Sequence, residues 1–161
     1  DALKTADSSV HPDRGGGAGW STTRLARPVG PNGRVYSQDV QREMLEAIKR
    51  RVQREGLQNV QTTLGSGSDP KLPVAGLDAI VVVDAYQEVD DRVTFLQNLA
   101  RALKPNGLIG VVNWKPGRGG PGPPENGRVD KASVTADVRA AKLRIVDEET
   151  LPYQYLLVLA K

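Results

Sequence analysis

Hydrophobic residues follow two different spacings along the chain, and these predict alternating strands and helices. LDAIVVVDA, residues 77–85, is a continuous apolar run of strand length, which is typical of a strand buried on both faces of a parallel sheet. LIGVVNW, residues 108–114, has the same character. In contrast, apolar residues spaced three and four apart predict an amphipathic helix over residues 41–56, where Gly56 provides the stop signal.

A second helix is expected over residues 91–104. Asp90 or Asp91 can cap its first turn, and Pro105-Asn106-Gly107 supplies a turn that ends it. The positions expected to form its buried stripe are Val93, Leu96, Leu99 or Ala100, and Leu103.

The remaining patterns complete an α/β domain. A short helix is expected after Ser21 or Thr22 and a weaker one over residues 132–143. Two strands close the chain and are expected to form an antiparallel pair. Strands that alternate with helices favour a mostly parallel sheet, whose ligands bind at the carboxyl ends of the strands. The other predicted strands cover residues 34–40, 59–64, 143–149 and 153–161.

Two segments carry no strand or helix pattern. KPGRGGPGPPENG, residues 115–127, is too rich in proline and glycine for a helix or a central strand, and we expect a mobile loop rather than a domain boundary. Residues 1–12 are polar and are expected to be a tail or the remnant of a preceding element. The domain itself is therefore predicted to cover residues 13–161.

Composition narrows the kinds of function that the domain can have. Among 161 residues, 39% are hydrophobic and 25% charged, as in a soluble globular protein. No cysteine and one histidine exclude thiolate chemistry and a multi-histidine metal centre, and we expect no metal. The net charge is only +3, and the basic cluster at residues 49–54 fits the solvated face of a helix, so no nucleic-acid partner is expected. No apolar run is long enough for a membrane span, and a cytoplasmic location is expected.

The glycine-rich stretch DRGGGAGW, residues 13–20, precedes a predicted helix. Such a loop exposes backbone N–H groups beside the positive end of a helix, which suits a nucleotide or another polar ligand. The spacing is not G-x-G-x-x-G, because Trp20 or Thr22 stands where the third glycine would be. It is not a P-loop either, because no lysine follows the glycines. It is D-x-G-x-G-x-G instead.

In this order of elements, that spacing resembles the class I S-adenosylmethionine-dependent methyltransferases, above all small-molecule enzymes of the ubiquinone and menaquinone biosynthesis type. The resemblance runs from Asp13 to the C-terminus and includes GWSTTRLARPVGPNGRVYSQDVQREMLEAI, LDAIVVVDAYQEVDD, ALKPNG and LPYQYLLVLAK. It implies a doubly wound, Rossmann-like sheet of seven strands with an antiparallel C-terminal strand. It also implies S-adenosylmethionine as cofactor and methyl transfer to a small molecule.

The resemblance assigns roles to individual residues of the glycine loop and at the carboxyl ends of the strands. The glycines would let the cofactor lie against the main chain, and an acid at the end of the second strand would accept hydrogen bonds from the ribose hydroxyls. An acid or hydroxyl after the third strand would bind adenine, and an acid after the fourth would border the methionine moiety. These cofactor-binding candidates are Asp13, Gly15, Gly17, Gly19, Asp39, Ser66, Asp69 and Asp84.

Three positions depart from the family pattern. Pro12 interrupts the segment SSVHPD, where the family has an apolar first strand. Gln87 stands where relatives frequently have histidine, and Asn113 where they frequently have an acid. Neither amide side chain can act as a general base at neutral pH.

The identity of a base therefore stays open. Tyr86, Glu88 or Asp84 could remove a proton from the acceptor, or the acceptor could ionise by itself. The alternative is a catalytically degenerate member that serves as a regulatory or interaction module. Few residues precede Asp13 to cover an acceptor. Either a covering segment has been trimmed, or the pocket is open, or a homodimer or a partner chain completes it. A nicotinamide-dependent oxidoreductase is disfavoured by the glycine spacing.

Overall fold

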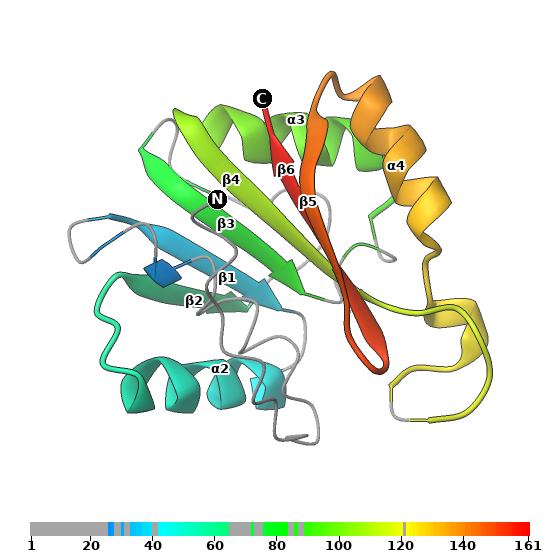
Figure 1. The fold of residues 1–161 in the computed structure, drawn as a ribbon, viewed down its shortest axis with the longest axis horizontal. Coiled ribbons are helices and arrows are strands. Elements are labelled where there is room, and N and C mark those ends of the chain that lie inside the picture. The colour runs from blue at the N-terminus through cyan, green and yellow to red at the C-terminus, as the bar shows by residue number, and fades with distance from the viewer. Residues whose placement is uncertain are drawn as a thin grey trace.

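The computed structural model describes residues 26–27, 30, 33–39, 42–64, 72, 76–83, 86, 89–120 and 122–161. For residues 38, 39, 44, 63, 64 and 83 it describes the backbone alone. Six strands form one sheet in the order β2-β1-β3-β4-β6-β5 (Figure 1). The strands are β1 (Val35–Asp39), β2 (Val60–Leu64), β3 (Leu77–Val83), β4 (Leu103–Trp114), β5 (Arg144–Thr150) and β6 (Gln154–Ala160).

The pairing of these strands confirms the predicted α/β architecture. β1 pairs in parallel with both β2 and β3, and β3 pairs in parallel with β4. β6 is antiparallel to its neighbours β4 and β5, as expected for the C-terminal pair. Six strands are present in the described part of the chain. The predicted seventh, around SSVHPD, lies outside it, and β1 and β3 are direct neighbours with no strand between them.

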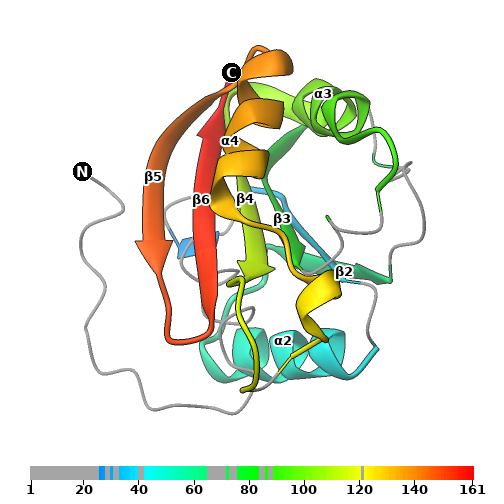
Figure 2. The ribbon, with the colours of Figure 1, turned by 90° about the vertical axis from the view of Figure 1, so that its right-hand side faces the viewer.

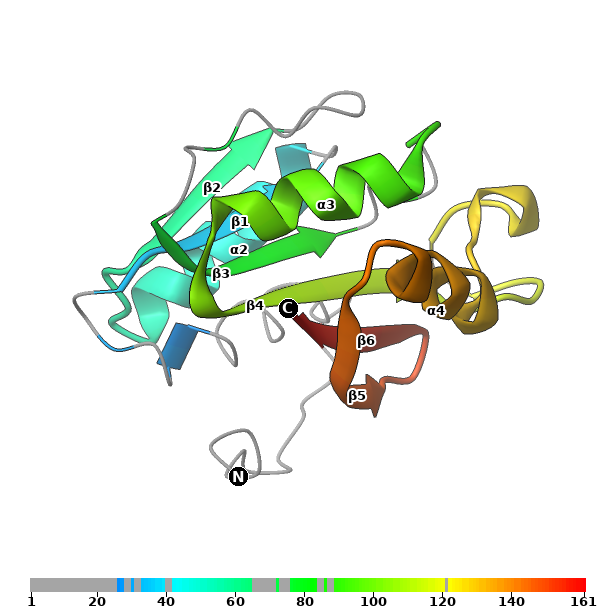
Figure 3. The same ribbon diagram turned by 90° about the horizontal axis from the view of Figure 1, so that it is seen from above.

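Helices cover both faces of the sheet. α2 (Arg42–Arg54) follows β1, α3 (Arg92–Ala102) follows β3, and α4 (Lys131–Ala140) precedes β5. Successive residues of β3 face opposite ways: Ile80 and Val82 join the core under α3 and α4, while Ala79 and Val81 join the core under α2. Figure 3 shows α2 and α3 on opposite sides of the sheet, and Figure 2 shows α3 beside α4.

Local signals explain where these helices start. The carboxylate of Asp91 accepts a hydrogen bond from the Thr94 backbone N–H at 3.0 Å, so Asp91 is the N-cap of α3. Asp130 caps α4 in the same way through the Ser133 N–H at 2.6 Å. Of the two predicted caps for α3, the structure therefore selects Asp91.

The end of α3 differs from the prediction. The helix stops at Ala102, and Leu103 is already extended and paired with Leu77 of β3. The pairing then jumps to Ala79 with Leu108, so the Pro-Asn-Gly turn lies inside β4 as an irregularity rather than before it. A Cβ on Gly107 would lie 2.9 Å from the Leu103 side chain, and this close approach explains the glycine.

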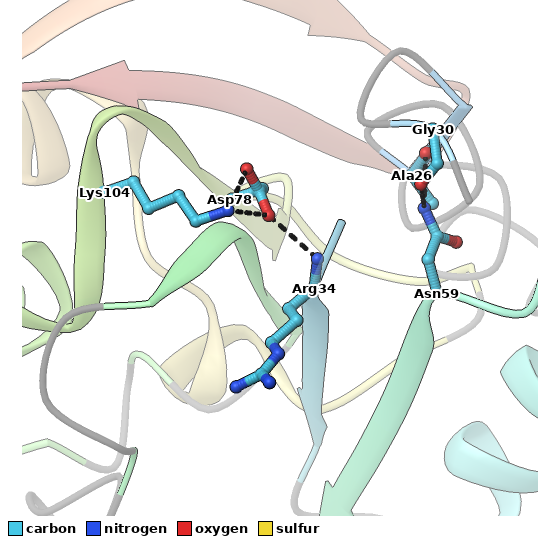
Figure 4. A network of polar contacts seen from close by, with 6 residues as sticks. All are labelled: Ala26, Gly30, Arg34, Asn59, Asp78 and Lys104. Atoms are coloured by element: carbon cyan, nitrogen blue, oxygen red, sulfur yellow. Dashed lines mark hydrogen bonds and ion pairs between the residues drawn. The ribbon is translucent and has the colours of Figure 1, made fainter. Parts of the chain in front are cut away.

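A polar network holds the amino-terminal edge of the sheet together (Figure 4). Asp78 accepts hydrogen bonds from the Arg34 backbone N–H at 2.9 Å and from Lys104 Nζ at 3.0 Å, which ties the starts of β1, β3 and β4. Asn59, before β2, donates through Nδ2 to the carbonyls of Ala26 and Gly30 at 2.9 and 2.8 Å. These groups stabilise the edge opposite the one where ligands are expected.

Candidate active site

The order of the strands creates a topological switch point between β1 and β3. From β1 the chain passes through α2 to β2 on one side, whereas β3 lies on the other side of β1. Ligands of open α/β sheets bind in the crevice beyond the carboxyl ends of the strands at such a point. Asp39 ends β1 and Val83 ends β3, and these two residues are register partners. The candidate site therefore lies at their carboxyl ends.

The structure describes only some of the predicted site residues. Asp39 lies at the carboxyl end of its strand, as predicted, and its backbone is at the switch point. Tyr86 follows β3 at the same edge. The remaining candidates lie outside the described residues, and their roles stay predictions: Asp13, Gly15, Gly17, Gly19, Ser66, Asp69, Asp84 and Glu88.

Tyr86 lies in an environment that disfavours the role of general base. Its side chain is fully buried, and its hydroxyl donates a hydrogen bond to Asp137 Oδ2 of α4 at 2.5 Å. The Arg92 guanidinium of α3 lies 5.0 Å from the ring centroid. Burial, and then the hydrogen bond to Asp137, raise the pKa of Tyr86 above its ordinary value, so the phenol stays protonated at neutral pH. These contacts favour a structural role for Tyr86, which links α3 through Arg92 to α4 through Asp137.

A second polar chain starts at Asn113, the penultimate residue of β4. Asn113 is 1% exposed, and its Nδ2 donates to the Tyr155 hydroxyl of β6 at 3.2 Å. Tyr155 in turn donates to the Val129 carbonyl at 2.6 Å. Within the described structure, Asn113 Oδ1 is buried and has no hydrogen-bond partner. The sequence pointed to Asn113 as a departure from a family pattern but gave no signal for Tyr155 or Val129.

Replacing Tyr155 with phenylalanine should flatten the alkaline dependence of stability. Burial raises the pKa of Tyr155 to about 12, against the opposing effect of the hydrogen bond from Asn113. The protonated phenol therefore stabilises the fold fully below about pH 10, and this contribution is lost as the pH rises through about 12. We expect the stability advantage of the unaltered chain over Tyr155→Phe to shrink by about 2 kcal/mol across that range.

Urea unfolding at several pH values between about 8 and 12 measures this difference. Tyr153→Phe is the matched control, since Tyr153 is 55% exposed and should leave the pH dependence unchanged. Parallel pH profiles for the unaltered chain and Tyr155→Phe would contradict the assignment.

Arg128 fastens the proline- and glycine-rich loop that follows β4. Its guanidinium donates to three backbone carbonyls of the loop: Nε to Pro123 at 2.9 Å, Nη1 to Lys115 at 3.3 Å and Nη2 to Gly119 at 3.0 Å. The loop also packs on Trp114, because a Cβ on Gly122 would lie 2.6 Å from its indole ring. The composition predicted a mobile loop, and these hydrogen bonds hold its described residues to Arg128. The loop is fixed next to the carboxyl end of β4.

Loss of this anchor should open the loop to proteolysis. Arg128→Gln removes donors to several carbonyls, each bond contributing about 1 kcal/mol, so the open form should become about 10-fold or more populated. Trypsin cleavage after Arg118, whose side chain is exposed, reports that opening. Arg139→Gln on the exposed side of α4 is the control and should leave the rate unchanged. Equal cleavage rates in Arg128→Gln and the unaltered chain would show that the anchor does not hold the loop.

The described residues contain neither a cluster of possible metal ligands nor a helix that could cross a membrane. Within them, no three histidine, aspartate or glutamate side chains gather in a way that could hold a metal ion. None of the helices in the described ranges combines the length and apolar character needed to cross a membrane.

Comparison with protein families identifies a known domain. A family model described as a methyltransferase domain matches residues 13–107, which include the glycine loop, β1, β3 and α3. Demethylmenaquinone methyltransferase of Geobacillus stearothermophilus is 33% identical over 93 residues, which cover 58% of this chain and 39% of that protein. The chain therefore spans well under half the length of this relative.

Longer matches extend the similarity beyond that domain. The ubiquinone/menaquinone biosynthesis C-methyltransferase of Coxiella burnetii is 29% identical over 147 residues, covering 90% of this chain and 56% of that protein. Among solved structures, a SAM-dependent methyltransferase from Aquifex aeolicus has a TM-score of 0.64 at 28% identity, and the match covers 90% of this chain and 78% of that one.

Proposed function

Since the chain belongs to the class I S-adenosylmethionine-dependent methyltransferases, we propose that it binds S-adenosylmethionine at the carboxyl ends of β1 and β3 and transfers its methyl group to a small molecule. One observation carries the proposal: an acid, Asp39, ends β1 at the topological switch point, in register with the end of β3. An acid at that point suits the two hydroxyls of a ribose.

The proposed cofactor contacts combine this edge with the glycine loop. Asp39 accepts hydrogen bonds from the ribose hydroxyls, and the glycines allow the methionine end to approach the backbone. Asp13 holds the loop or meets the methionine amino group through water. Ser66 or Asp69 borders the adenine, and Asp84 borders the methionine moiety.

When bound, S-adenosylmethionine supplies a methyl group activated by a sulfonium. The chain then has to hold the nucleophile in line with that methyl and exclude water, which is a task of positioning. Asn113 and Gln87 cannot take a proton, and Tyr86 donates its hydroxyl hydrogen to Asp137. We therefore favour an acceptor that ionises by itself or one that passes its proton to Glu88 or Asp84.

The acceptor is proposed to be a small apolar or phenolic molecule. Relatives named after their substrates include demethylmenaquinone methyltransferases and nocamycin O-methyltransferase of Saccharothrix syringae, which is 31% identical over 104 residues. A second copy of the chain or another protein is proposed to cover the acceptor. A cytoplasmic location and the lack of a nucleic-acid partner remain part of this proposal.

Calorimetric titration with S-adenosylmethionine and S-adenosylhomocysteine tests the cofactor site. We expect micromolar binding of both, with no binding of NAD or ATP, which share the adenosine but not the amino-acid end. Transfer of a labelled methyl group to a panel of phenols and quinols then tests activity. Binding without any transfer would favour the non-catalytic alternative, and no binding of either ligand would reject the proposed function.

A further inference from the structure

Asn113 has one end of its amide occupied and the other end buried without a partner. We propose that Asn113 selects the methyl acceptor by accepting, through Oδ1, a hydrogen bond from an O–H or N–H group of that molecule. This inference rests on the proposed function, because it assigns the residue to the acceptor side of the same site. Tyr155 acts as the positioning residue that fixes the amide.

The hydrogen bonds of Tyr155 determine which way the amide faces. A phenol has one hydrogen to donate, and that hydrogen goes to the Val129 carbonyl, which can only accept. The Tyr155 oxygen can therefore only accept from Asn113, so Nδ2 must face it. Consequently Oδ1 is the end of the amide directed away from Tyr155.

The place of Asn113 in the sheet connects this free oxygen with the site. Val112 pairs with Val83, the last residue of β3, so Asn113 lies one step beyond the end of that strand. Its partner on the other side is Tyr155 of β6. Asn113 thus flanks the switch point from the β4 side, next to Trp114 and the anchored loop, whereas the proposed cofactor contacts lie around β1 and β3.

A second buried amide shows why position matters. Asn59 also has an unpartnered Oδ1, but it lies before β2, at the amino-terminal edge where ligands of parallel sheets do not bind. Its Nδ2 instead fastens the carbonyls of Ala26 and Gly30. Of the two buried amide oxygens that lack a partner in the described ranges, only that of Asn113 lies at the ligand-binding edge.

The chemistry of the group defines the acceptor class. An amide oxygen accepts hydrogen bonds and does not take a proton at neutral pH, so Asn113 orients the acceptor but cannot deprotonate it. A buried acceptor without a partner discriminates strongly against ligands that lack a donor, because such ligands leave it unpaired. The selected acceptors are therefore phenols, enols, quinols or amines that bind in their protonated form and lose the proton only after binding.

Matched pairs of small probes test this selection on the chain saturated with S-adenosylhomocysteine. The pairs are phenol and anisole, 1-naphthol and 1-methoxynaphthalene, and aniline and N,N-dimethylaniline. We expect at least one donor-bearing probe to bind about 10-fold tighter than its partner, equivalent to about 1.4 kcal/mol. Asn113→Ala should remove that preference without changing the affinity of the methylated probe. Asn98→Ala, which removes only the acceptor of a hydrogen bond from Arg101 on α3, should keep it.

Tyr155→Phe provides a second variant that retains Asn113. The amide then loses the partner that orients it, and we expect the preference to fall to an intermediate value. The proposal is overturned if no donor-bearing probe is preferred, or if the preference survives in Asn113→Ala. It is also overturned if Asn113→Ala weakens S-adenosylhomocysteine itself, which would make the cofactor the partner of Oδ1. Failure of the unaltered chain to bind S-adenosylhomocysteine would instead reject the proposed function, and the probe pairs measured on the free chain would still report on Asn113.

Discussion

Binding of S-adenosylhomocysteine should weaken by about 100-fold or more when Asp39 is replaced with alanine. Asp39 ends β1 at the switch point, and we propose that its carboxylate accepts hydrogen bonds from both ribose hydroxyls. Hydrogen bonds to a charged group contribute about 1.5–3 kcal/mol each, so the loss of two accounts for a change of this size. Calorimetric titration of the variant against the unaltered chain measures the loss.

Two further variants separate this contact from a general effect. Asp39→Asn keeps the size of the side chain and one acceptor, so binding should fall by about 10-fold only. Glu43→Gln removes an exposed acid from the first turn of the neighbouring helix α2 and should leave binding unchanged. Equal weakening by Asp39→Asn and Glu43→Gln would mean that net charge, not a ribose contact, determines affinity.

Replacement of Phe95 with alanine should lower the free energy of unfolding by about 4 kcal/mol. Phe95 is 1% exposed and lies in the core between α3 and the sheet, together with Leu96 and Leu99. Truncation of such a side chain removes its burial and leaves a cavity that close-packed neighbours cannot fill completely. Urea unfolding monitored by circular dichroism measures the change.

Val93 offers the matched comparison on the same helix. It is only partly buried at the edge of this core, so Val93→Ala should cost less than about 1 kcal/mol. A similar loss of stability in both variants would show that α3 does not pack through the face seen here.

The strands and helices were predictable because each has a strong local pattern. The apolar run LDAIVVVDA became β3 over Leu77–Val83, with its residues buried on both faces, and the helix predicted over residues 41–56 became α2. The antiparallel pair at the end of the chain is also confirmed. In each case the spacing of apolar residues that are close in sequence determines which faces of the strand or helix are apolar.

Packing details were less predictable, because they depend on contacts between elements and not on the local pattern alone. The stripe expected on α3 correctly included Leu96 and Leu99 but omitted Phe95, which is buried, and included Val93, which is only partly so. The spacing of apolar residues allows more than one face of a helix to be chosen, and tertiary packing selects among them. Likewise, the pairing of Leu103 with Leu77 ends α3 earlier than the Pro-Asn-Gly turn suggests.

The candidate site was likewise predictable only in part. Its edge and Asp39 follow from the order of elements, since parallel strands bring their carboxyl ends together. The hydrogen-bond partners of the buried polar groups could not be predicted in this way, because these partners are distant in sequence. Asp137 is 51 residues from Tyr86, and Tyr155 is 42 residues from Asn113. The sequence therefore could not show that Tyr86, one of the candidate bases, is a buried hydrogen-bond donor.

The outer strand β5 has a consequence for how copies of the chain can meet. It ends the described sheet, and its sequence RIVDEET carries three consecutive acids, Asp147, Glu148 and Glu149. Edge-to-edge addition of a second β5 would bring these charged side chains of both copies together, and charges on an edge strand oppose extension of the sheet. A dimer that encloses the acceptor would therefore have to form through another surface.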